Sequence, residues 1–385
     1  MLAPKRAAQH TWPDEFKKWA PGTKVVTLVN SAPAKREAII GGQYDVLVCN
    51  YELAPKALAQ RFPFATVICD ESHKLKARTT LTFKLLRSNL AKFTHLVLLT
   101  GTPSPNSLED LWSQVYLIDG GQRLGCTLTS FRDRWFIQGH QAWDRSPRSN
   151  ARPEIEARIK DVCLSMAAED YLSLPPLMVS DIVVDLPAAA MGVYKTLKRD
   201  LTLEVGDGEQ VTAVHAAALT NKLLQCTAGS VYAESGQSVR LHDAKLDAVE
   251  ELVEELGDES LLVVYQFRSE LDALRQRFKG LVELRDSDDV IERWNTGRIK
   301  LLAVHPASGG TGLNLQAGGR HIVWTTPSYN SEHWTQTNAR LHRTGQNLGP
   351  VIVHRVLADE TVDASVVSAM GKKLSVQQLL MEALK

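Results

Sequence analysis

Short runs rich in Val, Ile and Leu alternate along this chain with segments of helical periodicity. Runs that are apolar throughout are typical of strands buried on both faces of a parallel sheet. The first half carries such runs at 24–29, 45–51, 66–70 and 95–99, and the second half at 261–267, 281–284, 300–305, 321–324 and 351–356. The sequence therefore predicts an α/β protein with two parallel sheets in tandem.

The length and charge balance of the chain limit the classes of function that it can have. With 385 residues and 44% hydrophobic content, the chain can form two or three domains, each with its own core. Lys+Arg and Asp+Glu both number 44, so overall basicity cannot drive nucleic-acid binding and any such contact must be local. No apolar stretch reaches the ~18 residues of a membrane span, and no secretion signal begins the chain. The five cysteines form no C-x-x-C pair, which argues against a zinc site or a disulfide framework.

We predict three segments. Residues 1–103 form the first α/β lobe, 104–240 a mainly helical insertion and linker rather than sheet, and 241–385 the second lobe. Between Asp243 and Gly257 the apolar residues lie on one helical face, so we expect an amphipathic helix capped at its start by Asp243 and ended by Gly257.

Polar residues follow two runs of the first lobe. Asp70-Glu71-Ser72-His73 comes directly after the apolar residues 66–69, and Thr100-Gly101-Thr102-Pro103 after the run at 95–99. Ligands collect at the carboxyl edge of such a sheet, where an Asp can hold Mg²⁺ and the next Glu can deprotonate a water. The alternative is a strand-to-helix cap and an ordinary turn.

The second lobe carries a Gly-rich segment and paired arginines. In Ser308-Gly309-Gly310-Thr311-Gly312 the glycines allow the backbone to approach a phosphate closely. Gln336, Arg340 and Arg343 are spaced i, i+4, i+7, which predicts one face of a helix with two guanidiniums aimed in one direction. The planar guanidinium presents several N–H donors that suit phosphate oxygens. The alternative is that these arginines form a solvated basic face of the helix.

In this order the motifs resemble the superfamily 2 helicase-like ATPases of the Swi/Snf branch, in the compact form of bacterial and phage members. The resemblance covers essentially the whole chain and adds the segments 3–19, 49–53 and 262–267. It implies two RecA-like lobes, ATP and Mg²⁺ as cofactors, DNA, in duplex form, as partner, and no membrane. It also implies a cytoplasmic translocase of a bacterial or phage-infected cell that steps along DNA as it hydrolyses ATP.

Carried over position by position, the resemblance assigns Asp70 to Mg²⁺ and ATP, Glu71 to the hydrolytic water, and Arg340 and Arg343 to catalysis from the second lobe. ATP binding also falls to Gly310, Gly312 and Gln336. Coupling of nucleotide to DNA falls to His73, Thr100 and Thr102. DNA binding falls to Pro4, Lys5, Asn50, Tyr51, Ser308 and Thr311.

One family motif is missing. No G-x-x-x-x-G-K-[ST] phosphate loop occurs in the sequence, and the family places it before Pro4-Lys5. We therefore expect the first lobe to be truncated and to lack a central strand, with an exposed apolar slot. The gene product could start upstream, a second polypeptide could complete the lobe as in a split helicase, or the protein could be a non-hydrolysing DNA-binding remnant.

A nuclease is the further alternative, because Pro13-Asp14-Glu15-Phe16-Lys17 superficially matches a Pro-Asp…Glu-x-Lys metal site. Such a site needs its carboxylates on separate strands, whereas these are adjacent in an expected helix that begins near Pro13. The sequence therefore does not favour a nuclease.

Overall fold

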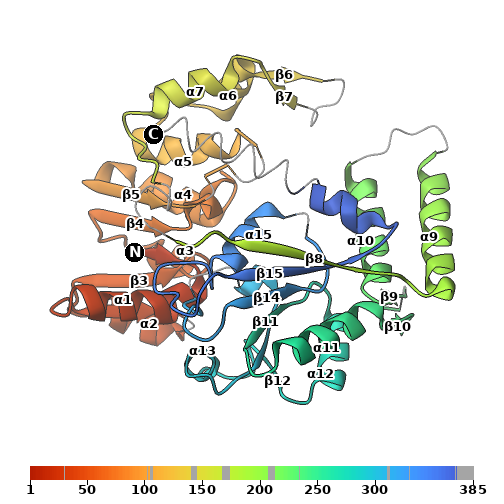
Figure 1. Ribbon diagram of the computed structural model, residues 1–385. Coiled ribbons are helices and arrows are strands. Elements are labelled where there is room, and N and C mark those ends of the chain that lie inside the picture. The colour runs from red at the N-terminus through yellow and green to blue at the C-terminus, as the bar shows by residue number, and fades with distance from the viewer. Residues whose placement is uncertain are drawn as a thin grey trace. The chain divides into compact units, whose positions relative to one another are not determined.

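The computed structural model describes residues 1–385 except 30, 102, 105–106, 140–144, 167–173, 207–212, 234, 310–312, 329, 369 and 371–385. The chain forms two compact units (Figure 1), unit 1 within Met1–Asp170 and unit 2 within Tyr171–Leu374. Each unit is built around its own parallel sheet, as the apolar runs predict.

The sheet of unit 1 has the strand order β2-β3-β1-β4-β5. Its strands are β1 (Leu2–Ala3), β2 (Val25–Leu28), β3 (Val46–Asn50), β4 (Thr66–Asp70) and β5 (His95–Leu99). All pair in parallel, and β1 pairs with both β3 and β4. Because all five strands run in parallel, their carboxyl ends lie at one edge of the sheet.

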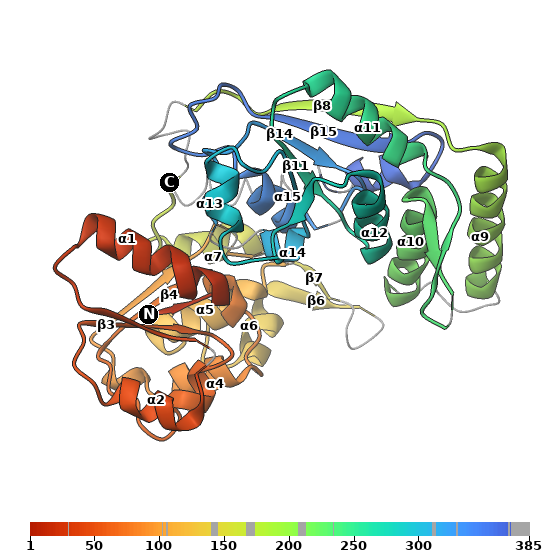
Figure 2. The same ribbon diagram turned by 90° about the horizontal axis from the view of Figure 1, so that it is seen from below.

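Helices cover both faces of this sheet (Figure 2), with α1 (Trp12–Trp19) on one side and α2 (Pro33–Ile40) and α4 (Leu81–Ser88) on the other. The π-helix η1 (Ala7–Thr11) packs two alanines against β1 and β3. The remaining elements are α3 (Ala54–Leu58), η2 (Ser72–Leu75), η3 (Leu90–Lys92), α5 (Asp110–Asp119), α6 (Leu128–Trp135), α7 (Ala151–Ile159) and the hairpin of β6 (Phe136–Gln138) and β7 (Arg145–Pro147).

The expected interior gap is not seen among the described strands, because β1 fills the position between β3 and β4. The Met1 ammonium donates to the Leu47 carbonyl at 2.7 Å and continues the ladder. Exposed apolar side chains lie instead on the edge strand β5, where Val97 and Leu99 are 42% and 39% exposed. An open edge with bare apolar residues is a site for self-association.

The sheet of unit 2 has the order β12-β13-β11-β14-β15-β8, again parallel throughout. Its strands are β8 (Met178–Val184), β11 (Leu261–Val264), β12 (Leu281–Glu283), β13 (Leu301–Val304), β14 (His321–Trp324) and β15 (Ile352–Ala358). The prediction that 104–240 is not sheet is wrong, because this segment contains two short hairpins and also contributes β8, which lies alongside β15 in Figure 1. Ser180 and Asp181 interrupt its apolar run because β8 is an edge strand, and Asp181 pairs with Arg355 of β15 at 2.6 Å.

The helices of unit 2 are α9 (Ala188–Gly206), α10 (Ala213–Thr227), α11 (Ala244–Leu256), α12 (Arg268–Arg277), α13 (Val290–Asn295), α14 (Pro306–Gly309) and α15 (Ser331–Asn338), with a hairpin of β9 (Ser230–Tyr232) and β10 (Ser238–Arg240). The predicted amphipathic helix is α11, and Gly257 ends it at φ 58°. Asp243 occupies the N-cap position, but its carboxylate binds Arg240 instead of capping the backbone. The ion pair with Arg240, three residues earlier in the chain, therefore takes the place of the expected backbone cap.

No helix in the described part of the chain is long and apolar enough to cross a bilayer. Cys49 and Cys69 are core residues of β3 and β4, as predicted. Burial raises the pKa of each thiol to about 12, so both are neutral packing groups.

Candidate functional site

The carboxyl edge of the unit 1 sheet gathers the predicted residues of the first lobe. Asn50 ends β3, Pro4 follows β1, Asp70 ends β4 and Thr100 follows β5. Because these four strands are neighbours, the residues form a row along one edge. The prediction that the Asp70 motif and the Thr100 turn share an edge is confirmed.

Two aromatic side chains position Asp70. Trp12 Nε1 donates to Asp70 Oδ2 at 2.9 Å, and the Tyr51 hydroxyl donates to the Asp70 carbonyl at 2.6 Å. Burial, reinforced by nearby negative groups, raises the pKa of Tyr51, so the phenol stays protonated and keeps donating. Sequence reasoning gave Trp12 no role, because its partner lies on a strand far along the chain.

Glu71 has an unusual backbone. Its φ and ψ are both 53°, in the left-handed region that non-glycine residues rarely adopt. Its carboxylate Oε2 is buried without a hydrogen bond in the described structure, and His73 Nδ1 lies 3.3 Å away. Strained backbone of this kind costs ~1–3 kcal/mol and concentrates at functional sites. The conformation places the Glu71 side chain beside Asp70 without a neutralising arginine or lysine bonded to it.

His73 also approaches the turn after β5, since its Nδ1 lies 3.4 Å from Thr100 Oγ1. A second link runs through Gln114: Ser72 Oγ donates to Gln114 Oε1 at 2.9 Å in a buried bond, and Gln114 Nε2 donates to the half-buried Pro103 carbonyl at 2.6 Å. Gln114 therefore ties the end of β4 to the Thr100–Pro103 turn from helix α5. The sequence offered no signal for it, because a single Gln in a helix has no motif.

The predicted DNA-side residues lie at the same edge. Asn50 is buried and its Nδ2 donates to Glu52 Oε2 at 2.8 Å, while its Oδ1 has no partner in the described structure. Burial alone would raise the pKa of Glu52, but the bond from Asn50 and the charges of Lys74 and Lys5 lower it overall. The edge thus carries an ionised carboxylate beside lysines that follow β1 and β4.

In unit 2 both predicted arginines contact the residues after the Gly-rich segment. Arg343 Nη1 donates to Asn314 Oδ1 at 2.7 Å. Arg340 Nη1 donates to the Leu313 carbonyl at 3.3 Å, and its Nε donates to the Gln336 carbonyl at 2.9 Å. The two guanidiniums therefore contact one segment, residues 313–314.

The predicted helical face is wrong, because α15 ends at Asn338 and neither arginine is helical. The N–H groups of Arg340 and Leu341 bond to carbonyls three residues back, which tightens the chain into turns. Leu341 then packs in the core of unit 2, and this packing directs the chain after the helix. The Gln336 side chain donates to Glu332 at 2.9 Å.

Several predicted residues cannot be placed. Thr102, Gly310, Thr311 and Gly312 lie outside the described residues. Ser308 lies in α14 directly after β13, at the carboxyl edge of the unit 2 sheet, and only its backbone is described.

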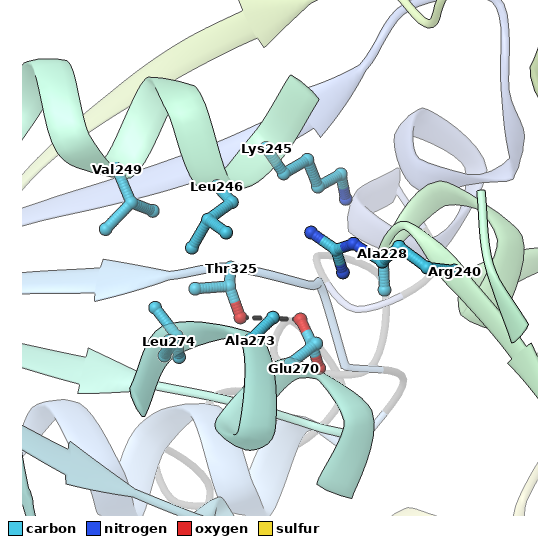
Figure 3. A pocket seen from close by; sticks show the side chains of 9 residues that line it. All are labelled: Ala228, Arg240, Lys245, Leu246, Val249, Glu270, Ala273, Leu274 and Thr325. Atoms are coloured by element: carbon cyan, nitrogen blue, oxygen red, sulfur yellow. Dashed lines mark hydrogen bonds between the residues drawn. The ribbon is translucent and has the colours of Figure 1, made fainter. Parts of the chain in front are cut away.

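A small cavity in unit 2 lies against α11, α12 and β14 (Figure 3). Its volume is about 20 Å³, enough for a single water and far too small for a nucleotide. Glu270 at its wall accepts from the Thr325 and Thr326 hydroxyls at 2.7 and 2.6 Å, and from the N–H groups of Gln266 and Phe267. This buried carboxylate is fully bonded, and it fixes the loop between β11 and α12.

The carboxylates of unit 1 are the candidate metal ligands. The described residues contain no group of three or more His, Cys, Asp or Glu side chains arranged around one point. Asp70 and Glu71 are hard oxygen donors, and one or two carboxylates completed by phosphate oxygens and water are what Mg²⁺ prefers.

Comparison with known proteins gives consistent results. Residues 1–229 match the model of the SNF2-related domain. A putative protein, p41, of Acyrthosiphon pisum secondary endosymbiont phage 1 is 36% identical over 100% of this chain and 88% of its own length. The human SWI/SNF-related regulator of chromatin, subfamily A member 1, is 25% identical over 99% of this chain, which spans only 38% of the human protein. A solved Sulfolobus solfataricus SWI2/SNF2 ATPase core with dsDNA is similar over 99% of this chain and 81% of its own, with 19% identity and a TM-score of 0.42.

Proposed function

The chain belongs to the SNF2-related family, and on that premise we propose that it hydrolyses ATP and uses the reaction to move along duplex DNA. The observation that carries the proposal is the conformation of Glu71. A buried carboxylate held in strained backbone, with an oxygen that lacks a donor, suits a general base awaiting a water.

Asp70 is assigned to nucleotide-bound Mg²⁺. Its Oδ2 accepts from Trp12, which orients the carboxylate at the sheet edge. The adjacent Glu71 Oε2, which accepts no hydrogen bond from the described residues, supports this assignment, because it could accept from the water shell of a cation. When bound, the ion would neutralise charge on the phosphate oxygens; Asp70 would hold it, and Glu71 would take a proton from water.

Arg340 and Arg343 are assigned to the phosphate charge that develops during hydrolysis. Their bonds to the Leu313 carbonyl and to the Asn314 side chain orient both guanidiniums. An arginine that stabilises such charge contributes ~10³–10⁵ in rate. Gly310, Gly312 and Gln336 are proposed to complete nucleotide binding.

Coupling between nucleotide and DNA is proposed for the contact of His73 with Thr100, together with Thr102. DNA binding is proposed for Pro4, Lys5, Asn50, Tyr51, Ser308 and Thr311. Because the net charge is zero, these local groups must provide the phosphate contacts.

The test is phosphate release by the full chain, with and without duplex DNA. We expect stimulation by DNA, a loss of ~10²–10⁴ in turnover for Glu71→Gln, and a loss of ~10³ or more for Arg343→Ala. Glu254→Gln on the exposed face of α11 is the matched control and should retain turnover. Turnover that survives both substitutions would reject the assignment.

A second candidate is a DNA-binding protein without hydrolysis, either alone or as one subunit of a split helicase. The observation that favours it is the absence of a G-x-x-x-x-G-K-[ST] motif from the 385 residues. Binding of duplex DNA without any phosphate release would support this candidate over the motor.

A further inference from the structure

One continuous helical segment joins a residue proposed to bind DNA to a partner of the proposed metal ligand. The chain is helical over residues 5–19, with the π-helix η1 in the middle and α1 directly after it. Lys5 begins this segment, and Trp12 follows seven positions later. The Trp12 indole donates to Asp70 Oδ2 at 2.9 Å. Lys5 and Asp70 are therefore connected through a single helical element and a single hydrogen bond.

The π-helix sets the direction in which Trp12 faces. The Trp12 N–H donates to the Ala7 carbonyl five residues back, whereas an α-helix uses the carbonyl four residues back. The turn thus holds one residue more than an α-helical turn, which corresponds to a rotation of about 100° at 3.6 residues per turn. Such turns are rare and are frequent at functional sites. A change from π to α at this turn would carry the Trp12 indole away from Asp70.

The packing around the turn leaves the indole dependent on it. Ala7 and Ala8 are buried against β1 and β3, and the Trp12 ring packs on the same cluster. Trp12 itself is only half-buried. Because the ring is not enclosed on every side, the turn that carries Trp12 decides whether its N–H reaches the carboxylate.

The start of the segment lies among the residues proposed to bind DNA. Lys5 is exposed, and its charge is one of the causes that lower the pKa of Glu52 beside Asn50. A phosphate bound by Lys5 would hold the start of the helical segment at the sheet edge. Since the segment runs to Trp12 without a break, this contact would restrict the conformations open to the π-turn.

We infer that Trp12 is a positioning residue that makes the affinity of Asp70 for Mg²⁺ depend on DNA bound at Lys5. The inference rests on the proposed function and deepens it, because it adds a second route between DNA and the metal ligand to the contact of His73 with Thr100. Trp12 acts through the orientation of Asp70, and outer partners that orient a metal-binding side chain contribute ~10–100-fold to metal affinity.

The test is the binding of Mn²⁺ to the full chain, followed by the EPR signal of the free ion, with and without a saturating duplex oligonucleotide. The test variant is Trp12→Phe, which keeps an aromatic ring on the alanine cluster and removes the N–H donor. Trp19→Phe is the matched control, because Trp19 lies on the same helix and also donates to a carboxylate, Glu15 Oε2, at 2.9 Å, but is 74% exposed. Binding that persists in Asp70→Asn, at DNA phosphates or elsewhere, is subtracted.

Without DNA, Trp12→Phe should weaken the binding of Mn²⁺ by ~10-fold or more. Duplex DNA should tighten the binding of Mn²⁺ to the unmodified chain by about 5-fold or more, and Trp12→Phe should lose this enhancement. Lys5→Gln, at a DNA concentration that saturates it, should lose the enhancement too, whereas Trp19→Phe should keep it. Equal Mn²⁺ affinities for Trp12→Phe and Trp19→Phe would overturn the inference, and so would an enhancement that survives in Trp12→Phe.

A spectroscopic measurement separates this role from a merely structural one. In protein labelled with 5-fluorotryptophan, the ¹⁹F NMR resonance that Trp12→Phe removes reports on the surroundings of Trp12. The resonance that Trp19→Phe removes reports on those of Trp19. Duplex DNA added without metal should shift the Trp12 resonance and leave the Trp19 resonance in place. A Trp12 resonance that stays in place while DNA binds would overturn the inference.

A failure of the proposed function gives a different result. If the unmodified chain does not bind duplex DNA, or binds Mn²⁺ no better than Asp70→Asn, the motor proposal fails and the inference fails with it. If the unmodified chain binds both and Trp12→Phe behaves as Trp19→Phe does, only the role of Trp12 is rejected.

Discussion

Replacing Gln114 by Leu should destabilise unit 1 out of proportion to the size of the change. Gln114 accepts from Ser72 Oγ at 2.9 Å and donates to the Pro103 and Asp110 carbonyls at 2.6 and 2.9 Å. Leu fills nearly the same volume, so no cavity forms. It leaves the Ser72 hydroxyl and the Pro103 carbonyl unpaired, and Ser72 is fully buried.

Each of these two unsatisfied groups costs ~1–3 kcal/mol, so the expected loss is about 2–6 kcal/mol in the free energy of unfolding. Hydrogen exchange measured by mass spectrometry on peptides that cover 66–75 and 110–119 would report this loss within unit 1. Gln60→Leu is the matched control, because Gln60 is exposed in the same unit and should change stability by less than ~0.5 kcal/mol.

The double variant Ser72→Ala/Gln114→Leu separates the bond from the packing. Removing both partners should recover about 1–2 kcal/mol relative to the sum of the single effects. A loss below ~0.5 kcal/mol for Gln114→Leu, or strict additivity in the double variant, would refute the reasoning that this Gln joins β4 to the turn after β5.

Three further outcomes follow from buried or exposed groups. Thr337 is fully buried, and its hydroxyl has no partner in the described structure. Thr337→Val should therefore raise the free energy of unfolding, measured in urea, by ~1–2 kcal/mol. A lower free energy of unfolding would mean that the hydroxyl has a hydrogen-bond partner. Val97→Lys on the open edge of β5 should reduce concentration-dependent light scattering without changing the stability of the fold. Unchanged scattering would mean that the chain does not self-associate through this edge. Burial, followed by the charge of His321, lowers the pKa of His354 to about 4. The unfolded chain therefore binds a proton first as pH falls, and stability should decrease by about 2 kcal/mol between about pH 6.5 and 4. His354→Gln should flatten this dependence, and an unchanged pH profile would assign it elsewhere.

The elements that the sequence predicted well are those with a local cause. The runs at 66–70 and 321–324 coincide with β4 and β14, because interior strands of a parallel sheet are largely apolar. The run at 95–99 coincides with β5, an edge strand that is apolar although it is partly exposed. The helix before the second sheet also follows from its own periodicity. The edge strand β8 was missed for the complementary reason: with one side open to solvent it tolerates Ser180 and Asp181, so its pattern is weak.

The arginines illustrate a prediction whose helical geometry is wrong. A spacing of i, i+4, i+7 implies a shared helical face, yet α15 ends before Arg340. Both guanidiniums still meet the same segment because Leu341 is anchored in the core and the turns around it aim Arg340 and Arg343 at residues 313–314.

The order of residues along the chain was enough to establish the class of fold, the strand ends that carry Asp70 and Thr100, and the family resemblance, since each of these depends on neighbours within a few positions. Packing decided the rest. The Trp12 indole orients Asp70 across 58 residues of sequence, and the Gln114 amide joins Ser72 to Pro103. The left-handed backbone of Glu71 is held by its folded surroundings. Such contacts exist only after the sheet has brought distant segments together, because a single polar or aromatic residue carries no sign of its partner until then.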